Sequence, residues 1–350
     1  MEMGSEFSAN SSRRGRNEYV DLCRYPKRYV LSGRTGLHII AGELSPAISR
    51  IWMPDYCCGS MIAPFVAQGF QVSFYAAFEW EQMEIDANAG AVLIMDYFGY
   101  LSEQTVAFAR RCKEAGMTVI ADATQTAFSR STLYDMADFV VCSYRKWLDC
   151  LCAVVYSKNG FRHSSETDEH PAYNETWRKA ATLKERYIRT GEGDKQEFLN
   201  LYARANHELS ESYMGYAANA AEVAVMESAD SAFIRTVRRE NACYLMEQMQ
   251  KLSETSDVQL LFDTMGTEDC PLFVPILLNV THRTAIRGEL TANGIYCPVH
   301  WPIDGRYPYE ETAYHKQELS LLCDQRYGMD EMKRQVSVLA HALAASETSH

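Results

Sequence analysis

Short apolar strings alternate with longer amphipathic stretches from Val30 onward, and this alternation limits the chain to few folds. Residues 91–95 are apolar throughout, as expected for a strand buried on both faces of its sheet. Residues 103–115 are amphipathic and precede Gly116, which is typical of the end of a helix. The pattern predicts an α/β fold in which a mostly parallel sheet lies between two layers of helices.

The other predicted strands are residues 50–53, 71–75, 118–120, 139–142 and 153–156, and helices are predicted at residues 37–44 and 61–68. In parallel sheets of this kind, ligands bind at the carboxyl ends of the strands. The polar residues that directly follow each strand are therefore the first candidates for a functional site.

The second half of the chain has a different pattern. Residues 178–212 predict two long charged helices with a break near residues 190–193, and a third long helix covers residues 232–252. A strand at residues 271–279 and helices at 283–293 and 330–344 follow these. This mixture predicts a smaller C-terminal domain of the α+β class.

With a boundary near residues 227–231, we expect a large domain over residues 17–228 and a small domain over residues 229–350. Residues 1–16 are rich in serine and arginine and contain no apolar signal core. They are predicted to be a disordered tail or a remnant of cloning, and they do not enter the fold prediction.

Composition excludes several classes of partner. Hydrophobic residues make up 47% and charged residues 23% of the chain, as in a globular protein. The net charge of -12 repels phosphate backbones, so nucleic acid is not an expected partner. No stretch approaches the roughly 18 apolar residues of a membrane helix, so a membrane is not expected either. The 11 cysteines lack the spacing of a zinc site, so no metal is expected, and they suit a cytoplasmic protein.

The first candidate site is the turn Ser32-Gly33-Arg34-Thr35-Gly36, which opens a predicted helix. Its backbone N–H groups, the helix dipole and the arginine would together bind a phosphate group. An ordinary capped turn is the alternative interpretation of the same residues.

Two further candidates follow the ends of predicted strands. Asp122 and Gln125 follow one strand, where a partly desolvated carboxylate needs a cation, although Asp122 taken alone favours the interpretation as a helix cap. Ser143 and Lys146 follow the next strand, where the alternative is a solvated basic strand end.

Taken together, the three candidates suit pyridoxal phosphate. This cofactor needs an anion site for its phosphate, a carboxylate that keeps its ring nitrogen protonated, and a lysine amine that forms a Schiff base. The chain presents a phosphate-binding turn, Asp122 and Lys146 in that order along a predicted parallel sheet.

Several motifs lead to a known family. They are Ser32-Gly33-Arg34-Thr35, Pro54-Asp55-Tyr56, Asp122-Ala123-Thr124-Gln125, Ser143-Tyr144-Arg145-Lys146, Gly294-Ile295 with His300-Trp301-Pro302, and Asp324-Gln325-Arg326-Tyr327. With these motifs the chain resembles, from about Tyr29 onward, the DegT/DnrJ/EryC1/StrS group of fold-type-I pyridoxal-phosphate enzymes, which sugar aminotransferases typify.

The resemblance implies a role for each matching residue. Lys146 would hold the cofactor as a Schiff base, Asp122 would pair with the ring nitrogen, and Gln125 would contact the ring hydroxyl. The phosphate would be held by Gly33, Arg34, Thr35 and Ser143. The resemblance also implies a homodimer and an aminotransferase that acts on a small-molecule amino donor and acceptor.

The chain departs from the family pattern at two places. Only two residues separate Ser143 from Lys146, and no glycine-rich segment follows the lysine. In the family an aromatic residue stacks on the cofactor ring, and here that position falls near Tyr56-Cys57-Cys58 and matches Cys58. Either Tyr56 stacks on the ring instead, or the face of the ring is packed differently. These departures suggest a divergent branch, so a nucleotide-sugar substrate is not assumed.

The residues that contact the substrate are weaker predictions. Arg326 would bind a substrate carboxylate in a bidentate fork, with His300 and Tyr97 as walls of the pocket. The alternatives are that Arg326 braces the last helix, that His300 is a core histidine and that Tyr97 only packs.

Two other functions remain open from the sequence. One is a pyridoxal-phosphate enzyme of another reaction type, such as a lyase or a racemase, and the other is a non-catalytic homologue. A dinucleotide-binding oxidoreductase is disfavoured, because no Gly-x-Gly-x-x-Gly motif follows the first strand.

Overall fold

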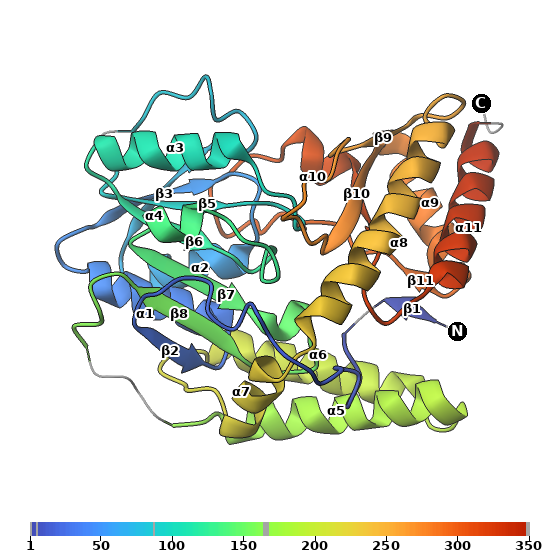
Figure 1. Ribbon diagram of the computed structural model, residues 1–350, viewed down its shortest axis with the longest axis horizontal. Coiled ribbons are helices and arrows are strands. Elements are labelled where there is room, and N and C mark those ends of the chain that lie inside the picture. The colour runs from blue at the N-terminus through green and yellow to red at the C-terminus, as the bar shows by residue number, and fades with distance from the viewer. Residues whose placement is uncertain (1, 5, 87, 164–167, 348–350) are drawn as a thin grey trace.

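A sheet of seven strands forms the centre of the computed structural model, which describes residues 2–4, 6–86, 88–163 and 168–347 (Figure 1). The strands follow the order β2 (Lys27–Val30), β8 (Ala153–Ser157), β7 (Phe139–Ser143), β6 (Thr118–Asp122), β5 (Ala91–Met95), β3 (Arg50–Pro54) and β4 (Gln71–Tyr75). β8 runs antiparallel to both of its neighbours, and the remaining pairs are parallel. The predicted α/β fold with a mostly parallel sheet is confirmed.

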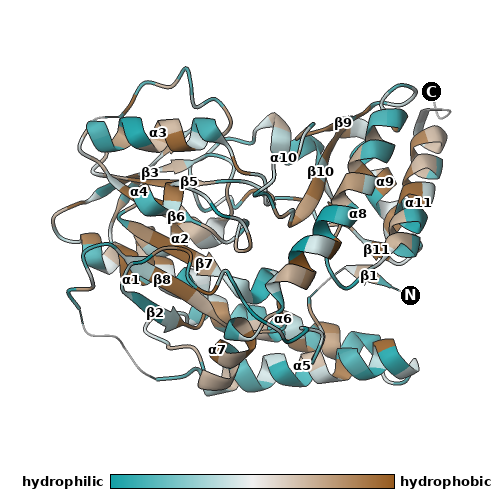
Figure 2. Cartoon of the chain, viewed as in Figure 1, coloured by the Kyte–Doolittle hydropathy of each residue, from teal (hydrophilic) through white to brown (hydrophobic). Residues whose placement is uncertain are grey.

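Helices pack against this sheet because its strands are apolar on both faces. All five residues of β5 are buried, and the central strands are coloured hydrophobic in Figure 2. α1 (Gly33–Leu44) packs against β7 and β8 and also contacts α2 (Gly59–Ala67). α3 (Glu103–Glu114) packs against β5 and β6, beside the short α4 (Leu133–Met136).

Two long helices, α5 (Pro171–Thr190) and α6 (Lys195–Glu211), pack together along the lower edge of Figure 1. α5 ends at Gly191, whose φ of 70° belongs to the left-handed region that glycine adopts without a steric penalty. The predicted pair of helices, broken near residues 190–193, is confirmed. Trp177 and Tyr202 belong to a separate apolar cluster between the helices.

The last part of the chain contains a second, smaller sheet. It has the antiparallel order β12 (Glu318–Leu322), β10 (Phe273–Leu278) and β9 (Val258–Leu260). The helices around it are α8 (Ser231–Leu252), α9 (Val280–Ala292), α10 (Ala313–Gln317) and α11 (Met329–Glu347), whereas α7 (Ala220–Glu227) lies beside α5 in Figure 1. The predicted mixture of helices and strands is present, although the strands β9 and β12 were not predicted. The division of the chain into domains at residues 228 and 229 remains a prediction.

The first residues differ from the disordered tail that the sequence suggests. β1 (Met3–Gly4) pairs in parallel with β11 (Ile295–Tyr296), and the side chains of Met3 and Phe7 are buried. The segment 2–4 and 6–16 (the N-terminal segment) is ordered by contacts with residues far along the chain, which its local composition does not reveal. Met1 and Ser5 lie outside the described residues.

Within the described part of the chain, no helix combines the length and the apolar character that crossing a bilayer requires.

Candidate functional site

Polar residues from three strands meet at one edge of the central sheet. β6 ends at Asp122, β7 ends at Ser143, and a single 3₁₀ turn over Tyr144–Lys146 follows β7 directly. β2 leads into the first turn of α1 at the same edge. A cavity of about 120 Å³ (the strand-end cavity) lies between them. It is lined by six of the predicted residues, namely Gly33, Arg34, Asp122, Gln125, Ser143 and Lys146.

The first turn of α1 sits directly against the end of β7. A Cβ atom added to Gly33 would lie 3.3 Å from the Cβ of Ser143, so glycine leaves the space that an incoming group needs. The Nε atom of Arg34 is buried and has no hydrogen-bond partner among the described residues, and burial lowers the pKa of this guanidinium. Both features suit a phosphate group.

Thr35, which was predicted to hold the phosphate, turns away from the cavity. Its backbone N–H donates to the Oγ of Ser32 over 3.1 Å, and its hydroxyl donates to the backbone oxygen of Tyr213 over 2.8 Å. Ser32 caps α1 and lines the cavity in its place.

Asp122 is 5% exposed and is held by a turn. The backbone N–H of Thr124 donates to its Oδ1 over 2.8 Å, while the Thr124 hydroxyl accepts from the backbone N–H of Ser143 over 3.2 Å. Burial raises the pKa of the Asp122 carboxyl, although the hydrogen bonds from Thr124 and the charge of Lys146 oppose this shift. No cation of the described residues lies within ion-pair distance of Asp122, so a positively charged ligand group would stabilise it.

Gln125 is 1% exposed, and its two amide atoms are in different situations. Its Oε1 accepts from the backbone N–H of Phe98 over 2.5 Å, which fixes the amide. Its Nε2 is buried without a partner among the described residues. A buried donor of this kind is costly unless a ligand oxygen accepts from it.

Lys146 projects from the 3₁₀ turn and borders the strand-end cavity as well as a neighbouring cavity. The next residue, Trp147, anchors the turn, because its Nε1 donates to the backbone oxygen of Thr124 over 2.8 Å. The backbone oxygen of Trp147 accepts from Gln325 over 2.7 Å, which ties the turn to the last part of the chain.

Tyr56 lies apart from the cavity lining. Its ring is fully buried in an aromatic cluster, where it packs 5.1 Å from Trp301 and 5.7 Å from Tyr97. Cys58 lines the cavity instead, with its Sγ 2.9 Å from the hydroxyl of Ser60. Tyr97 belongs to the same aromatic cluster and donates to the backbone oxygen of Tyr56 over 2.9 Å.

The neighbouring cavity, of about 320 Å³, contains the other two predicted substrate residues. Arg326 forms a bidentate ion pair with Asp324, at 2.8 Å from Nε to Oδ1 and 2.9 Å from Nη2 to Oδ2. Its guanidinium also lies 4.1 Å from the ring centre of Phe7. His300 is buried, with its Nδ1 3.0 Å from the hydroxyl of Ser320.

Three of the residues that line the strand-end cavity without a role assigned from the sequence are Thr124, Arg145 and Trp301. All three belong to the motifs described above. Their positions near Asp122, Lys146 and His300 were the only indication in the sequence that they could line the site. Their roles depend on side-chain direction, which the motifs do not specify.

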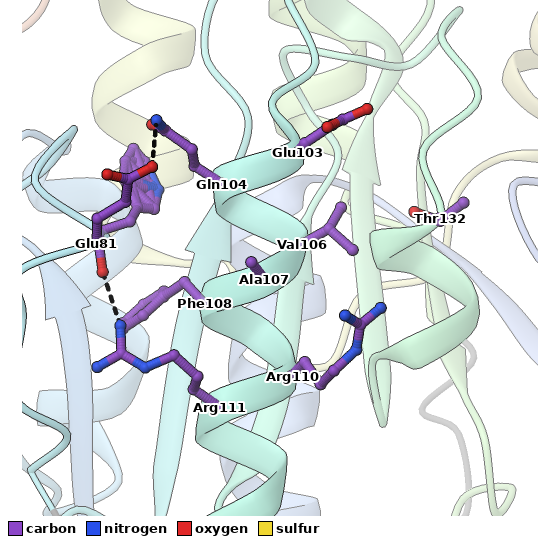
Figure 3. Close-up of a pocket in the computed structure, with 10 residues that line it drawn as sticks. Glu81, Glu103, Gln104, Val106, Ala107, Phe108, Arg110, Arg111 and Thr132 are labelled. Atoms are coloured by element: carbon purple, nitrogen blue, oxygen red, sulfur yellow. Dashed lines mark hydrogen bonds between the residues drawn. The ribbon is translucent and has the colours of Figure 1, made fainter.

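A larger concavity, of about 640 Å³, lies against α3 and contains none of the predicted residues (Figure 3). Three of its polar side chains, Glu81, Gln104 and Arg111, already have hydrogen-bond partners. Gln104 donates to Glu81 over 2.9 Å, and Arg111 donates to the backbone oxygen of Trp80 over 2.9 Å. The strand-end cavity therefore remains the candidate site.

The residues of this cavity fit pyridoxal phosphate. The opening beside Gly33 and the buried Nε of Arg34 suit its phosphate, and the Asp122 carboxylate lacks a cation. The unpartnered Nε2 of Gln125 suits an oxygen on the ring, and Lys146 supplies a primary amine.

Comparison with known proteins agrees with the fold. No family model matches the chain, and no curated protein is significantly similar in sequence. Among solved structures, Helicobacter pylori PseC, an aminotransferase of pseudoaminic acid biosynthesis, is 13% identical with a TM-score of 0.68, covering 98% of this chain and 94% of PseC. A DegT DnrJ EryC1 StrS aminotransferase from Brucella abortus is 13% identical with a TM-score of 0.61, covering 91% and 86%. NtdA from Bacillus subtilis, solved with bound cofactor PMP, is 14% identical with a TM-score of 0.62, covering 95% and 78%.

At these identities the similarity establishes the fold. The fold-type-I architecture expected from the family resemblance is thereby confirmed.

Proposed function

We propose that the chain is a pyridoxal-phosphate-dependent aminotransferase that acts on a small-molecule amino donor and acceptor. The observation that carries the proposal is one cavity that brings Lys146 together with Asp122, Gln125 and the opening beside Gly33. The solved structures of the same fold that were compared above are themselves described as aminotransferases or hold an aminotransferase cofactor form.

Pyridoxal phosphate, when bound, withdraws electrons from the carbon that carries the substrate amine. The Asp122 carboxylate would keep the ring nitrogen protonated, because a buried anion and a buried cation stabilise each other. Gln125 would donate from Nε2 to the ring oxygen. Gly33 and Ser143, at the first turn of α1 and the end of β7, would bind the phosphate with Arg34.

Lys146 would first hold the cofactor through its Nζ atom and, once an incoming amine has replaced it, move a proton at the reacting carbon. Lys146 lies on a short turn that Trp147 anchors through two hydrogen bonds, one from its side chain and one to its backbone oxygen. The anchored turn limits how far the amine moves between these two tasks. Cys58 would border the ring where the family resemblance places an aromatic side chain, and Trp301 also lines this cavity.

The test is an absorbance titration of the purified protein with pyridoxal phosphate. Binding through a lysine should give a band near the edge of the visible range that borohydride abolishes, with the reduced label on the peptide that contains Lys146. Addition of a competent amino donor should then convert the bound cofactor to its amine form, which elimination or racemisation does not do.

The Lys146→Ala variant should lose the borohydride-stable label and all turnover. Lys158→Ala is the matched control, because Lys158 is an exposed lysine on the same part of the chain that lines neither cavity. If Lys146→Ala still carried the label, or if the native protein bound no pyridoxal phosphate, the proposed function would be wrong.

We also propose that two copies form a homodimer, as the family resemblance implies, and that the protein is cytoplasmic. All eleven cysteines lie within the described residues and are free thiols, nine of them buried, which suits a reducing compartment.

A further inference from the structure

The cavity beside Lys146 has a strongly cationic lining. Of the described residues that line it, five are cationic and two are carboxylates, Glu6 and Asp324. The cationic residues are Arg145, Lys146, Arg238, Arg287 and Arg326. Asp324 forms the bidentate pair with Arg326 and its charge also interacts with that of Arg238, but the five cationic residues still outnumber the two carboxylates. An excess of positive charge around a cavity of about 320 Å³ favours an anionic ligand.

Arg145 is the arginine best placed to bind such a ligand. It is half-buried and lines both cavities, directly before Lys146 in the chain. Its Nη1 donates to the Oδ1 of Asn206 over 3.0 Å, and its guanidinium lies 4.8 Å from the ring centre of Trp177. These neutral partners hold the side chain in position without neutralising its charge.

Arg238 adds a second fixed charge. It is fully buried on α8, and its Nε donates to the side-chain oxygen of Gln325 over 2.6 Å. Its Nη1 donates to the backbone oxygens of Pro271 and Leu272 over 3.1 and 3.0 Å. Among the described residues, no carboxylate lies within ion-pair distance of Arg145 or Arg238.

We propose that this cavity binds the oxyanion of the amino substrate, a carboxylate or a phosphate, through Arg145. The inference rests on the proposed function, because it places that group beside the amine of Lys146. In this proposal Arg145 binds the anion in place of Arg326, because the charge of Arg326 is paired with Asp324. The volume lies at the low end for ligand cavities and restricts the substrate to a small compound.

A change at Glu6 should have the opposite effect on anion affinity from a change at Arg145. Glu6 lies on the N-terminal segment and lines the same cavity, and its charge interacts with that of Arg145. The segment is fixed there by backbone contacts, since both Lys184 and Arg326 donate to the backbone oxygen of Glu6. Removal of the Glu6 charge should therefore favour a bound oxyanion without displacing the segment.

The experiment is calorimetric titration of the protein loaded with pyridoxal phosphate, and of the protein without it. The probes are glutarate, methyl phosphate and neutral glutaramide. Glutarate or methyl phosphate should bind, glutaramide should bind at least roughly tenfold more weakly, and the stronger anion identifies the class of oxyanion. Equal binding of glutaramide and both anions would overturn the proposal.

Three variants sharpen the result. Arg145→Gln should weaken anion binding roughly tenfold to hundredfold, because a hydrogen bond to a charged group is lost. Glu6→Gln should strengthen it roughly twofold to fivefold. Arg204→Gln removes an exposed arginine of α6 that pairs with Glu208, and it should change nothing.

The outcomes separate the two proposals. Absorbance monitors the loading with pyridoxal phosphate, and a protein that does not load counts against the proposed function. Glutarate binding by the unloaded protein tests the anion site in either case. If Arg145→Gln does not fold, the Glu6→Gln result decides. Unchanged affinity in Glu6→Gln or in a folded Arg145→Gln would overturn the assignment.

Discussion

A single methyl group added at Gly36 should disturb the site, although the same change at Gly42 should help the fold. Both glycines lie in α1, whose first turn carries Gly33. A Cβ atom at Gly36 would lie 2.8 Å from the Cγ2 of Val141 in β7, closer than side chains tolerate. At Gly42 the nearest atom would be the Nε2 of Gln68, 4.0 Å away, which is an ordinary van der Waals contact.

The magnitudes follow from this difference in space. Gly→Ala inside a helix stabilises a protein by about 0.5–1 kcal/mol, and this gain is common to both variants. Overpacking a rigid valine costs about 1–3 kcal/mol, which applies to Gly36→Ala alone. The free energy of unfolding should therefore be about 1–3 kcal/mol lower in Gly36→Ala than in Gly42→Ala.

The assay is urea denaturation of both variants without cofactor, followed by titration with pyridoxal phosphate. Relief of the clash requires α1 to move away from β7, which shifts the turn around Gly33 relative to Ser143. Gly36→Ala should therefore bind the cofactor more weakly, whereas Gly42→Ala should match the native protein. Equal stability of the two variants would show that α1 is not seated as tightly as the geometry requires.

Two further predictions concern charge and assembly. Because burial raises the pKa of the Asp122 carboxyl, ionisation of this carboxyl opposes folding. The cofactor-free native protein should therefore lose stability relative to Asp122→Asn as the pH rises. The loss should begin at about pH 4, near the pKa of the carboxyl in the unfolded chain, and continue through the raised pKa. Urea midpoints of the two proteins between pH 4 and 8 measure the difference in stability, which should favour Asp122→Asn at high pH. Cofactor affinity should instead favour the native protein. A stability difference that does not change with pH would contradict the burial argument. The proposed homodimer should sediment at twice the mass of one chain, and a single-chain mass at micromolar concentration would refute it.

The sequence predicts the positions at the strand ends well, for a physical reason. Short apolar strands such as residues 91–95 have one plausible structure, and parallel strands bring their ends together whatever the loops do. Asp122, Ser143 and Lys146 could therefore be placed at one site without knowledge of any contact. The first turn of α1 was predicted in the same way, from Gly33 and the helix that follows.

The direction in which a side chain points is harder to predict than its position in the chain. Thr35 stands in the right turn, but its hydroxyl binds the backbone oxygen of Tyr213, 178 residues away. Arg326 stands two residues after Asp324, and nothing in that spacing shows that the two form a closed pair. The aromatic packing of Tyr56 likewise arises from long-range contacts that no local pattern encodes.

The pairing of β1 with β11 sets an order of events during synthesis. Met3 is made well before Ile295, its partner, which follows nearly 300 residues later, roughly 15–60 s afterwards at ordinary rates of translation. Glu6 and Phe7 can form a wall of the cavity beside Lys146 only after that delay. A nascent chain whose central sheet has already folded would therefore still lack this wall of the cavity until Ile295 has been made.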